Sequence, residues 1–214
     1  MQAQVTSQGH EKSGNEKYTD SNSTKFQLKA GPGFSTLSYD GTSTNKDNRS
    51  GLFLGAEFEA PLAHVVSIQT GVDYSQKGMK QTSTVLGTSF DNTIALNYLE
   101  IPLLLKLSMP LSDAFIITAA AGPYVGYALS RSASTTVTNG SAAAGAEQDV
   151  SSTYSKWDYG ARFAAGFEIP VMSSMAFLLG AEYDLGVKDI ATPVNQSAIR
   201  TRNLAADVGI SLRM

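Results

Sequence analysis

The stretch from Trp157 to Ile169 reads WDYGARFAAGFEI and alternates between two kinds of side chain. Apolar and aromatic residues occupy every odd position, whereas the even positions carry Asp158, Arg162 and Glu168 among glycine and alanine. Successive side chains of a β-strand point to opposite faces of the sheet. This period of two therefore predicts a strand with one apolar face and one charged face.

The same alternation recurs along the chain from residue 25 onward. Seven further segments have it, at residues 25–34, 52–60, 66–75, 93–108, 115–129, 177–186 and 203–214. Strands of soluble sheets are usually about five to six residues long. A tilted strand that crosses a bilayer needs about nine to eleven residues. The lengths of these segments therefore favour strands that span a membrane.

Short and long connections alternate between the segments. The short ones lie at residues 61–64, 109–113 and 170–175, and the long polar ones at 39–50, 77–92, 130–155 and 188–200. Outer-membrane barrels combine brief periplasmic turns with extended external loops in this way. The sequence predicts an all-β fold, an eight-stranded antiparallel transmembrane β-barrel with up-and-down meander topology. In the fourth strand the apolar phase shifts from Tyr98 to Leu99, which predicts a β-bulge near Tyr98.

Charge is confined to one face of each predicted strand. The opposite, apolar faces carry none, whereas the polar faces hold Glu57, Glu59, Asp73, Arg162, Glu168, Glu182, Asp184, Asp207 and Arg213. We expect the apolar faces to meet lipid. A soluble lipocalin-like barrel, with its charges outside and a ligand cavity inside, is the structural alternative. Aromatic residues near the predicted strand ends suggest an interfacial girdle, namely Phe34, Tyr39, Tyr74, Tyr98, Tyr127, Trp157 and Tyr159.

The first residues differ from the rest of the chain. Residues 1–24 contain almost no large apolar side chain, so we expect a flexible polar tail, followed by an outer-membrane β-barrel domain over residues 25–214. The printed start lacks a basic segment followed by an apolar one, so any signal peptide would already be missing from it. An outer-membrane location follows from the barrel prediction.

Composition excludes several classes of partner and site. A net charge of -3 provides no basic field for a polyanion, which argues against nucleic acid. The chain has no cysteine, hence no disulfide framework and no thiolate metal site. Its length of 214 residues suits one β-barrel domain.

Three short motifs are specific enough to compare with known families, namely YSQKG at residues 74–78, YLEIPLLLK at 98–106 and AGPYVGY at 121–127. Together they resemble the PorT-like outer-membrane β-barrel family of Gram-negative bacteria, also called the porin family. The resemblance extends over roughly residues 25–214 and implies an eight-stranded barrel in the outer membrane. It implies no catalytic or binding residue. The last residue, Met214, departs from the phenylalanine that commonly ends such barrels.

Histidine is too scarce for the usual catalytic or metal centres. The chain has only His10, in the predicted tail, and His64, in a short turn, so a Ser-His-Asp site or a multi-histidine metal site has few members to draw on. His64 beside Glu57 or Glu59 could hold a metal, but an ordinary turn residue explains it better. We predict no enzyme activity, no catalytic, cofactor-binding or metal residue, and no cofactor.

Paired carboxylates have a structural explanation in a narrow barrel. Glu57 and Glu59 share one strand face, as do Glu182 and Asp184, which acid/base catalysis would also require. An eight-stranded barrel is just wide enough for side chains to fill its interior, so inward carboxylates need cationic partners. The candidate partners are Arg162, Lys106, Arg213, Lys29 and Lys25.

These observations predict a small barrel with a filled lumen that acts as a structural, interaction or accessory component of the cell envelope. A small-solute or ion channel is the alternative, and a lipid-modifying enzyme is the least supported. The expected partners are outer-membrane lipid and lipopolysaccharide, and envelope proteins reached through the external loops 130–155 and 77–92.

Overall fold

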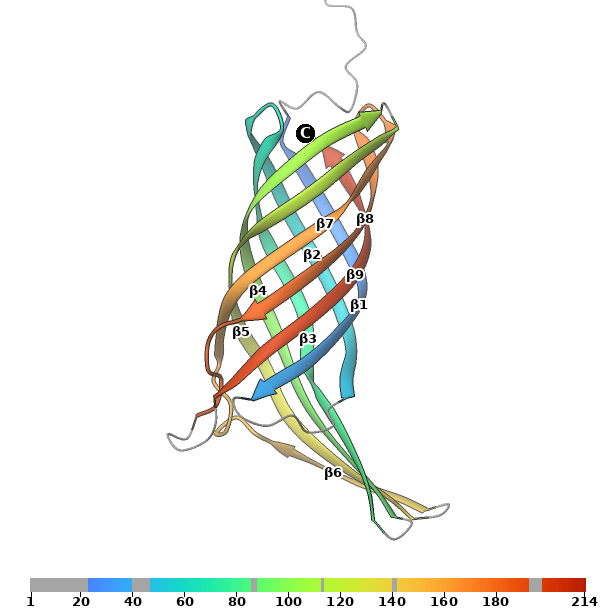
Figure 1. Cartoon of the computed structure of the whole chain (residues 1–214), viewed down its shortest axis with the longest axis vertical. Helices are drawn as coiled ribbons and strands as arrows, with labels where there is room; N and C mark the ends of the chain where they lie inside the picture. Colours follow the sequence, from blue (N-terminus) through green and yellow to red (C-terminus); the bar gives the residue numbers. More distant parts are fainter. Residues whose placement is uncertain (1–22, 40–46, 86–87, 113, 140–141, 193–197) are drawn as a thin grey trace, which may run out of the picture.

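The chain folds into antiparallel β-strands that wind around a common axis (Figure 1). The computed structural model describes residues 23–39, 47–85, 88–112, 114–139, 142–192 and 198–214. The strands are β1 (Lys25–Tyr39), β2 (Asp47–Ala63), β3 (Val66–Val85), β4 (Thr88–Ser112), β5 (Phe115–Asn139), β6 (Ala142–Asp149), β7 (Trp157–Met172), β8 (Met175–Gly186) and β9 (Ile199–Arg213). Within these ranges, no helix is long and apolar enough to cross a membrane.

Eight of the strands close into a barrel. Each pairs antiparallel with its neighbour in the order β1, β2, β3, β4, β5, β7, β8, β9, and the ring closes because β9 pairs back onto β1. The last strand, β6, pairs with the far part of β5 and lies outside the ring. The predicted eight-stranded antiparallel meander is therefore confirmed, with one additional strand.

The two ends of the barrel differ. At one end, two-residue connections join β2 to β3, β4 to β5, and β7 to β8, at residues 64–65, 113–114 and 173–174. The C-terminus lies at this end, where Met214 N–H donates to Thr24 O at 2.9 Å (Figure 1). We call it the short-turn end, and the opposite one the long-loop end.

Apolar side chains form the outer surface of the barrel. Phe58, Leu105 and Phe177 are each at least half exposed, and the odd positions of the 157–169 stretch are exposed or partly exposed. The charged positions of the same strands are buried inside the ring. The soluble lipocalin-like alternative is therefore wrong, because it would place the charged faces outward and the apolar faces inward.

Two segments predicted as loops are largely paired strands, which corrects the prediction. Residues 77–92 belong mostly to β3 and β4, which pair as far as Val85 and Thr88. Residues 130–155 contain the far part of β5 and all of β6, paired as far as Asn139 and Ala142. Their threonines favour strands although they carry little apolar surface, and such polar strands resemble loops when only hydrophobicity is considered.

These segments leave the barrel wall as one sheet. Residues 81–85, 88–97, 130–139 and 142–149 pair side by side in the order β3, β4, β5, β6, and they project beyond the long-loop end (Figure 1). We call this sheet the hairpin extension. Gly78 adopts φ +146°, a conformation that favours glycine, close to where β3 stops pairing with β2.

The predicted bulge near Tyr98 is found at that level but on the neighbouring strand. The β4–β5 register shifts between Asn97 and Tyr98, where Ser130 and Ala128 are their partners, so the extra residue is Leu129 on β5. In β4 itself the alternation continues, since Leu96, Tyr98 and Glu100 are all buried. Tyr98 consequently points into the barrel and is not part of an aromatic girdle.

The outward aromatic residues at the long-loop end fit the girdle better. Trp157 and Tyr159 are half exposed, and Trp157 packs edge-on against Tyr127 at 5.1 Å between ring centres. Most of the predicted N-terminal tail, residues 1–22, lies outside the described residues, as does the side chain of Tyr39.

Candidate functional site

The lumen gathers the charged side chains of the barrel. Among the described residues, nine carboxylates and five cationic side chains are buried. The carboxylates are Glu57, Glu59, Asp73, Glu100, Asp158, Glu168, Glu182, Asp184 and Asp207, and the cations are Lys25, Lys29, Lys77, Lys106 and Arg162. Because a lone buried charge is costly, the contacts among these groups decide what the lumen can do.

Near the short-turn end, two lysines and two glutamates form a balanced cluster. Lys106 Nζ contacts Glu59 Oε2 at 2.7 Å and Glu168 Oε1 at 2.6 Å. Lys25 Nζ contacts Glu168 Oε2 at 2.8 Å and lies 3.7 Å from Glu59 Oε1. We call these four residues the short-turn cluster. Each glutamate meets both lysines, so the charges of the cluster compensate one another.

Arg162, on β7, occupies the middle of the lumen. Its guanidinium contacts the Asp73 carboxylate, Glu100 Oε2 at 2.7 Å, Glu182 Oε2 at 3.2 Å and Asp184 Oδ1 at 2.6 Å. A guanidinium offers five N–H donors in a fixed plane and stays protonated in proteins. One side chain can therefore hold carboxylates from β3, β4 and β8 together.

Lys77 and Lys29 extend this network in opposite directions. Lys77 Nζ contacts Glu100 Oε1 at 2.5 Å and Asp184 Oδ2 at 3.0 Å. Lys29 Nζ contacts Glu57 Oε2 at 2.8 Å and also pairs with Glu182. Excluding the short-turn cluster, three buried cations face seven buried carboxylates in the described lumen. The excess of carboxylates thus belongs entirely to the middle of the barrel.

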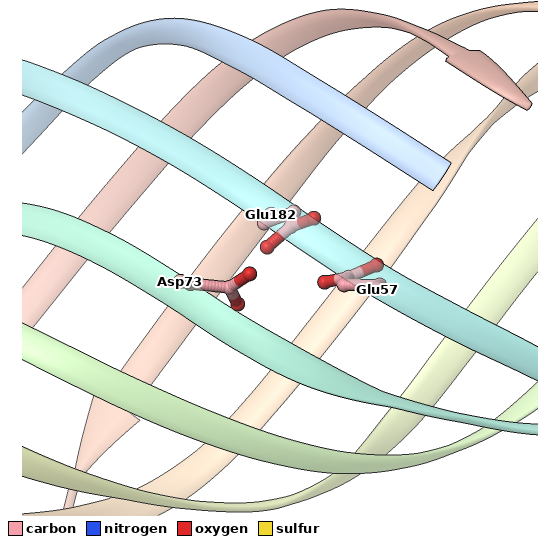
Figure 2. A group of neighbouring side chains, drawn as sticks. All are labelled: Glu57, Asp73 and Glu182. Atoms are coloured by element: carbon pink, nitrogen blue, oxygen red, sulfur yellow. The ribbon is translucent and has the colours of Figure 1, made fainter. Parts of the chain in front are cut away.

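Three of these carboxylates converge on one point. Glu57 on β2, Asp73 on β3 and Glu182 on β8 each offer an oxygen, and these oxygens lie within 4.8 Å of one another (Figure 2). We call them the carboxylate triad. Hard cations such as Ca²⁺ are bound by carboxylate oxygens, so this is the arrangement in the described lumen that could hold a metal.

Apolar residues close the lumen at the long-loop end. The buried set that we call the apolar plug consists of Leu37, Met79, Leu96, Tyr98, Ala128, Tyr154, Ile190 and Ile199. Two connecting segments, 150–156 and 187–192, contribute to it and are joined by hydrogen bonds from Ser155 N to Ile190 O at 2.7 Å and from Thr192 N to Thr153 O at 2.8 Å. Together these segments form a lid.

Most of the ion pairs expected from the sequence are present. Arg162, Lys106, Lys29 and Lys25 all contact buried carboxylates, as predicted. Glu57 and Glu59 are both ion-paired, and so are Glu182 and Asp184. Arg213 donates from Nε to Ser23 Oγ at 2.7 Å, at the short-turn end.

The inward charges named from the sequence do not include Lys77 or Glu100, whereas Asp158 lies on the predicted charged face of its strand and is buried in the lumen. Lys77 had been assigned to a loop, although it has the same parity as Asp73 on a strand that continues. Glu100 lies between the outward-facing Leu99 and Ile101 and has the same parity as Lys106, so the predicted phase of this strand also places it in the lumen. Asp158 accepts hydrogen bonds from Thr201 Oγ1 at 2.7 Å and Tyr124 OH at 3.2 Å.

His64 lies in the exposed turn between β2 and β3, whereas Glu57 and Glu59 are buried. The carboxylate group found among the described residues contains Glu57 but no histidine. The structure therefore gives no support to a metal site built on His64.

Comparison with known proteins identifies the barrel type. The family model described as "Outer membrane protein beta-barrel domain" matches residues 2–192. The outer membrane protein OprG from Pseudomonas aeruginosa is 15% identical with a TM-score of 0.50, over 92% of this chain and 98% of that one. Neisserial surface protein A is 12% identical with a TM-score of 0.50, over 88% and 97%. Both likenesses concern the fold alone. No curated protein sequence matches the chain.

Proposed function

Because this chain belongs to the outer membrane protein beta-barrel domain family and lies in the outer membrane, we propose that it is a non-conducting, non-enzymatic barrel that presents the hairpin extension to partners outside the cell. The observation that carries this proposal is the contrast between a filled lumen and an ordered sheet that projects from it.

The filling of the lumen supports a scaffold rather than a channel. Ion pairs occupy its short-turn half and its middle, and the apolar plug covers the long-loop end. One cavity, lined in part by Lys106 of the short-turn cluster and by Lys29, Glu182 and Asp207, has a volume of about 50 Å³, room for only a few water molecules. Open aqueous pores need about 16 to 18 strands, twice the number in this ring.

The hairpin extension supports interaction with a partner. Its strands fix their backbone by mutual pairing, so residues 81–85, 88–97, 130–139 and 142–149 present an ordered surface. Two strands form the edges of this sheet. β6 pairs with β5 along one side, and the part of β3 beyond Lys80 pairs with β4 along one side. The outer edges of such strands can accept an added strand through main-chain hydrogen bonds.

The orientation follows from the lengths of the connections. In outer-membrane barrels the short turns face the periplasm and the long connections face outward. The extension would then stand at the level of lipopolysaccharide and beyond, with Trp157 and Tyr159 at the outer interface. Contacts with lipopolysaccharide and with an envelope protein partner are both part of the proposal.

Membership of the PorT-like branch is a further part of the proposal. It is supported by the three motifs at residues 74–78, 98–106 and 121–127. Two of these segments contribute to the lumen network, since Lys77 and Glu100 are among their residues. The motifs would then be retained for packing of the lumen rather than for a reaction.

Conductance is the first test. The purified barrel, inserted in a planar bilayer, should give no stepwise current, because the plug and the ion pairs fill the described part of the lumen. Reproducible steps that disappear with heat-denatured protein would overturn the non-conducting part and favour the channel.

Orientation and display can be tested by labelling, since the chain has no cysteine of its own. Ser83→Cys, in the extension, should react with a membrane-impermeant maleimide on intact cells. Val65→Cys, in a short turn, should react only after the envelope is broken. The reverse pattern would place the extension in the periplasm.

Partner contact can be tested with a photo-crosslinking residue. At Glu147 on β6 it should yield a discrete protein adduct in living cells, whereas at Leu105, on the lipid-facing wall, it should yield none. If no position in the extension gives an adduct that Leu105 lacks, the interaction role fails.

A further inference from the structure

We propose that the middle of the lumen binds one divalent cation, with Ca²⁺ or Mn²⁺ the best fit, through the carboxylates of Glu57, Asp73 and Glu182, with Asp207 lining the same small cavity as Glu182. The site lies within the barrel, so it is independent of what the hairpin extension binds.

The spacing of the triad suits an ion of this size. Its three oxygens lie within 4.8 Å of one another, and the carboxylates face a common centre (Figure 2). Oxygens on opposite sides of a Ca²⁺ ion are separated by about 4.6 to 5.2 Å, twice the usual metal–oxygen distance. Mg²⁺ holds its ligands closer, at about 2.0 to 2.1 Å, and dehydrates reluctantly.

The ion pairs already present leave one oxygen of Glu57 and one of Asp73 free, whereas the two oxygens of Glu182 contact Lys29 and Arg162. Glu57 contacts Lys29 through Oε2, and Asp73 contacts Arg162 through Oδ2. The other oxygens, Glu57 Oε1 and Asp73 Oδ1, are buried without a hydrogen-bond partner in the described structure. A cation could therefore bind these atoms without displacing either Lys29 or Arg162.

Asp207 provides an independent indication. It is only 4% exposed, and its Oδ1 is buried with no hydrogen-bond partner among the described residues. On β9 it pairs with Gly180, two residues before Glu182 on β8, and both carboxylates line the cavity of about 50 Å³. Leaving such an oxygen unpaired is costly, so Asp207 Oδ1 is an atom that could bind a cation.

Local charge supports the same conclusion. The triad and Asp207 are four carboxylates, and the cations that contact the triad are Lys29 and Arg162. Arg162 also contacts Glu100 and Asp184, so the buried charges outside the short-turn cluster are counted together. Seven carboxylates against three cations leave an excess of four, which one divalent cation would halve. The short-turn cluster, with two of each sign, needs no such ion.

Small residues make room for the triad. A Cβ at Gly55 would lie 2.8 Å from Asp73 Oδ1, and one at Gly71 would lie 2.8 Å from Glu57 Cγ. Both glycines occupy the strands that carry these two carboxylates. An ion bound here would join β2 and β3 to β8 and β9, on either side of β1.

The test is metal retention by the folded barrel. Full-length protein is unfolded with a chelator, refolded in detergent with Mn²⁺ and desalted. The metal is added during refolding because the lid would slow its entry into a folded lumen. We expect one Mn²⁺ per barrel, with a dissociation constant below about 1 mM, the weak end of known oxygen-ligand sites. Ca²⁺ should compete for the site.

Variants locate the ion. Asp207→Asn should lower Mn²⁺ affinity by about tenfold, a loss typical of groups that support a metal site. The substitution breaks none of the ion pairs found among the described residues. Asp73→Asn should lower it further. Glu168→Gln, equally buried but in the short-turn cluster, is the control and should bind as the parent does. Heat-modifiable migration on a gel verifies that each variant is folded.

Two outcomes would overturn the proposal. One is the absence of retained Mn²⁺ in folded parent protein, which would mean that protons neutralise the carboxylates. The other is retention that Asp207→Asn and Asp73→Asn leave unchanged, which would place the ion outside the lumen. Neither outcome would alter the conductance and labelling results, so failure of this site is distinguishable from failure of the proposed function.

Discussion

The middle of the lumen and its long-loop end are enclosed by the same eight strands but are filled by opposite chemistry. In the middle, Arg162 alone contacts four carboxylates. At the long-loop end, Leu96 and Ile190 are completely buried among other apolar side chains of the plug. Both fillings close the barrel, but they respond differently to the loss of one member.

This difference indicates which part of the lumen is most sensitive to substitution. In the charged region each group has several partners, and removing one cation leaves several desolvated carboxylates unpaired. In the plug, removing a side chain leaves a cavity whose cost depends on its volume and on how far the neighbours relax. The lumen is therefore most sensitive at its centre and more tolerant under the lid.

The largest effect is expected for Arg162→Met. The substitution keeps much of the volume but leaves Asp73, Glu100, Glu182 and Asp184 without the guanidinium. Breaking a buried ion pair in this one-sided way costs about 3 to 5 kcal/mol. We expect a loss of unfolding free energy of at least that size, or failure to refold, measured by urea unfolding in detergent.

Lys80→Ala is the control for this prediction. Lys80 Nζ lies 3.7 Å from Asp91 Oδ2 in the hairpin extension, with 45% and 32% of the two side chains exposed. Such surface pairs contribute less than about 1 kcal/mol. An Arg162→Met barrel as stable as the Lys80→Ala barrel would show that the central network does not stabilise the fold.

An intermediate effect is expected for Leu96→Ala in the apolar plug. Leu96 has no exposed surface, and its truncation should cost about 2 to 3 kcal/mol of unfolding free energy, within the range for buried leucines. Leu105→Ala, on the same strand but 54% exposed on the outer wall, should cost less because detergent or lipid fills the gap. Equal losses for the two variants would contradict a dry, packed plug.

The barrel and its two faces were predictable because their signal is local. The alternation in 157–169 or 177–186 fixes which side chains point outward, whatever the neighbouring strand is. Because only one face of each strand carries charge, the uncharged face is the one expected to meet lipid. The partners Arg162 and Lys106 followed from the same parity.

The carboxylate triad could not be predicted in the same way, since it depends on register between strands. Glu57 pairs with Gly71 and Gly55 pairs with Asp73, which makes Glu57 and Asp73 diagonal neighbours. A shift of one residue would send one of them to the outer face. Glu182 joins them from β8, beyond β1 and β9 in the ring.

The hairpin extension was missed for a different reason. Segments such as 81–85 and 130–139 are rich in serine and threonine, and only their mutual pairing makes them strands. Outside the membrane neither face has to be apolar, so the alternation that reveals the barrel strands is weak there.

The smallest effect is expected at the lid, from Asp189→Ala. Asp189 Oδ1 accepts hydrogen bonds from Ile199 N and Ala191 N, each at 2.9 Å, beside the apolar plug. These backbone donors, Ile199 first, lower the pKa of the Asp189 carboxyl below its ordinary 3.8. A lowered pKa means that the ionised group stabilises the lid above pH 3.8, and that this contribution is lost as pH falls through the folded-state pKa.

Because Asp189 is exposed, solvent screens the effect, and we expect less than about 1 kcal/mol. At pH 6 the Ile199 amide of Asp189→Ala should exchange hydrogen faster than in the parent, by less than about fivefold, the factor that corresponds to this energy. The two proteins should converge below the folded-state pKa. Asp149→Ala, whose carboxylate accepts from Ser151 N outside the plug, is the control. Equal hydrogen exchange of the Ile199 amide in the parent and in Asp189→Ala at pH 6 would mean that plug packing alone holds the lid. The contrast between the charged and the apolar regions would then extend to the outermost residues of the lumen.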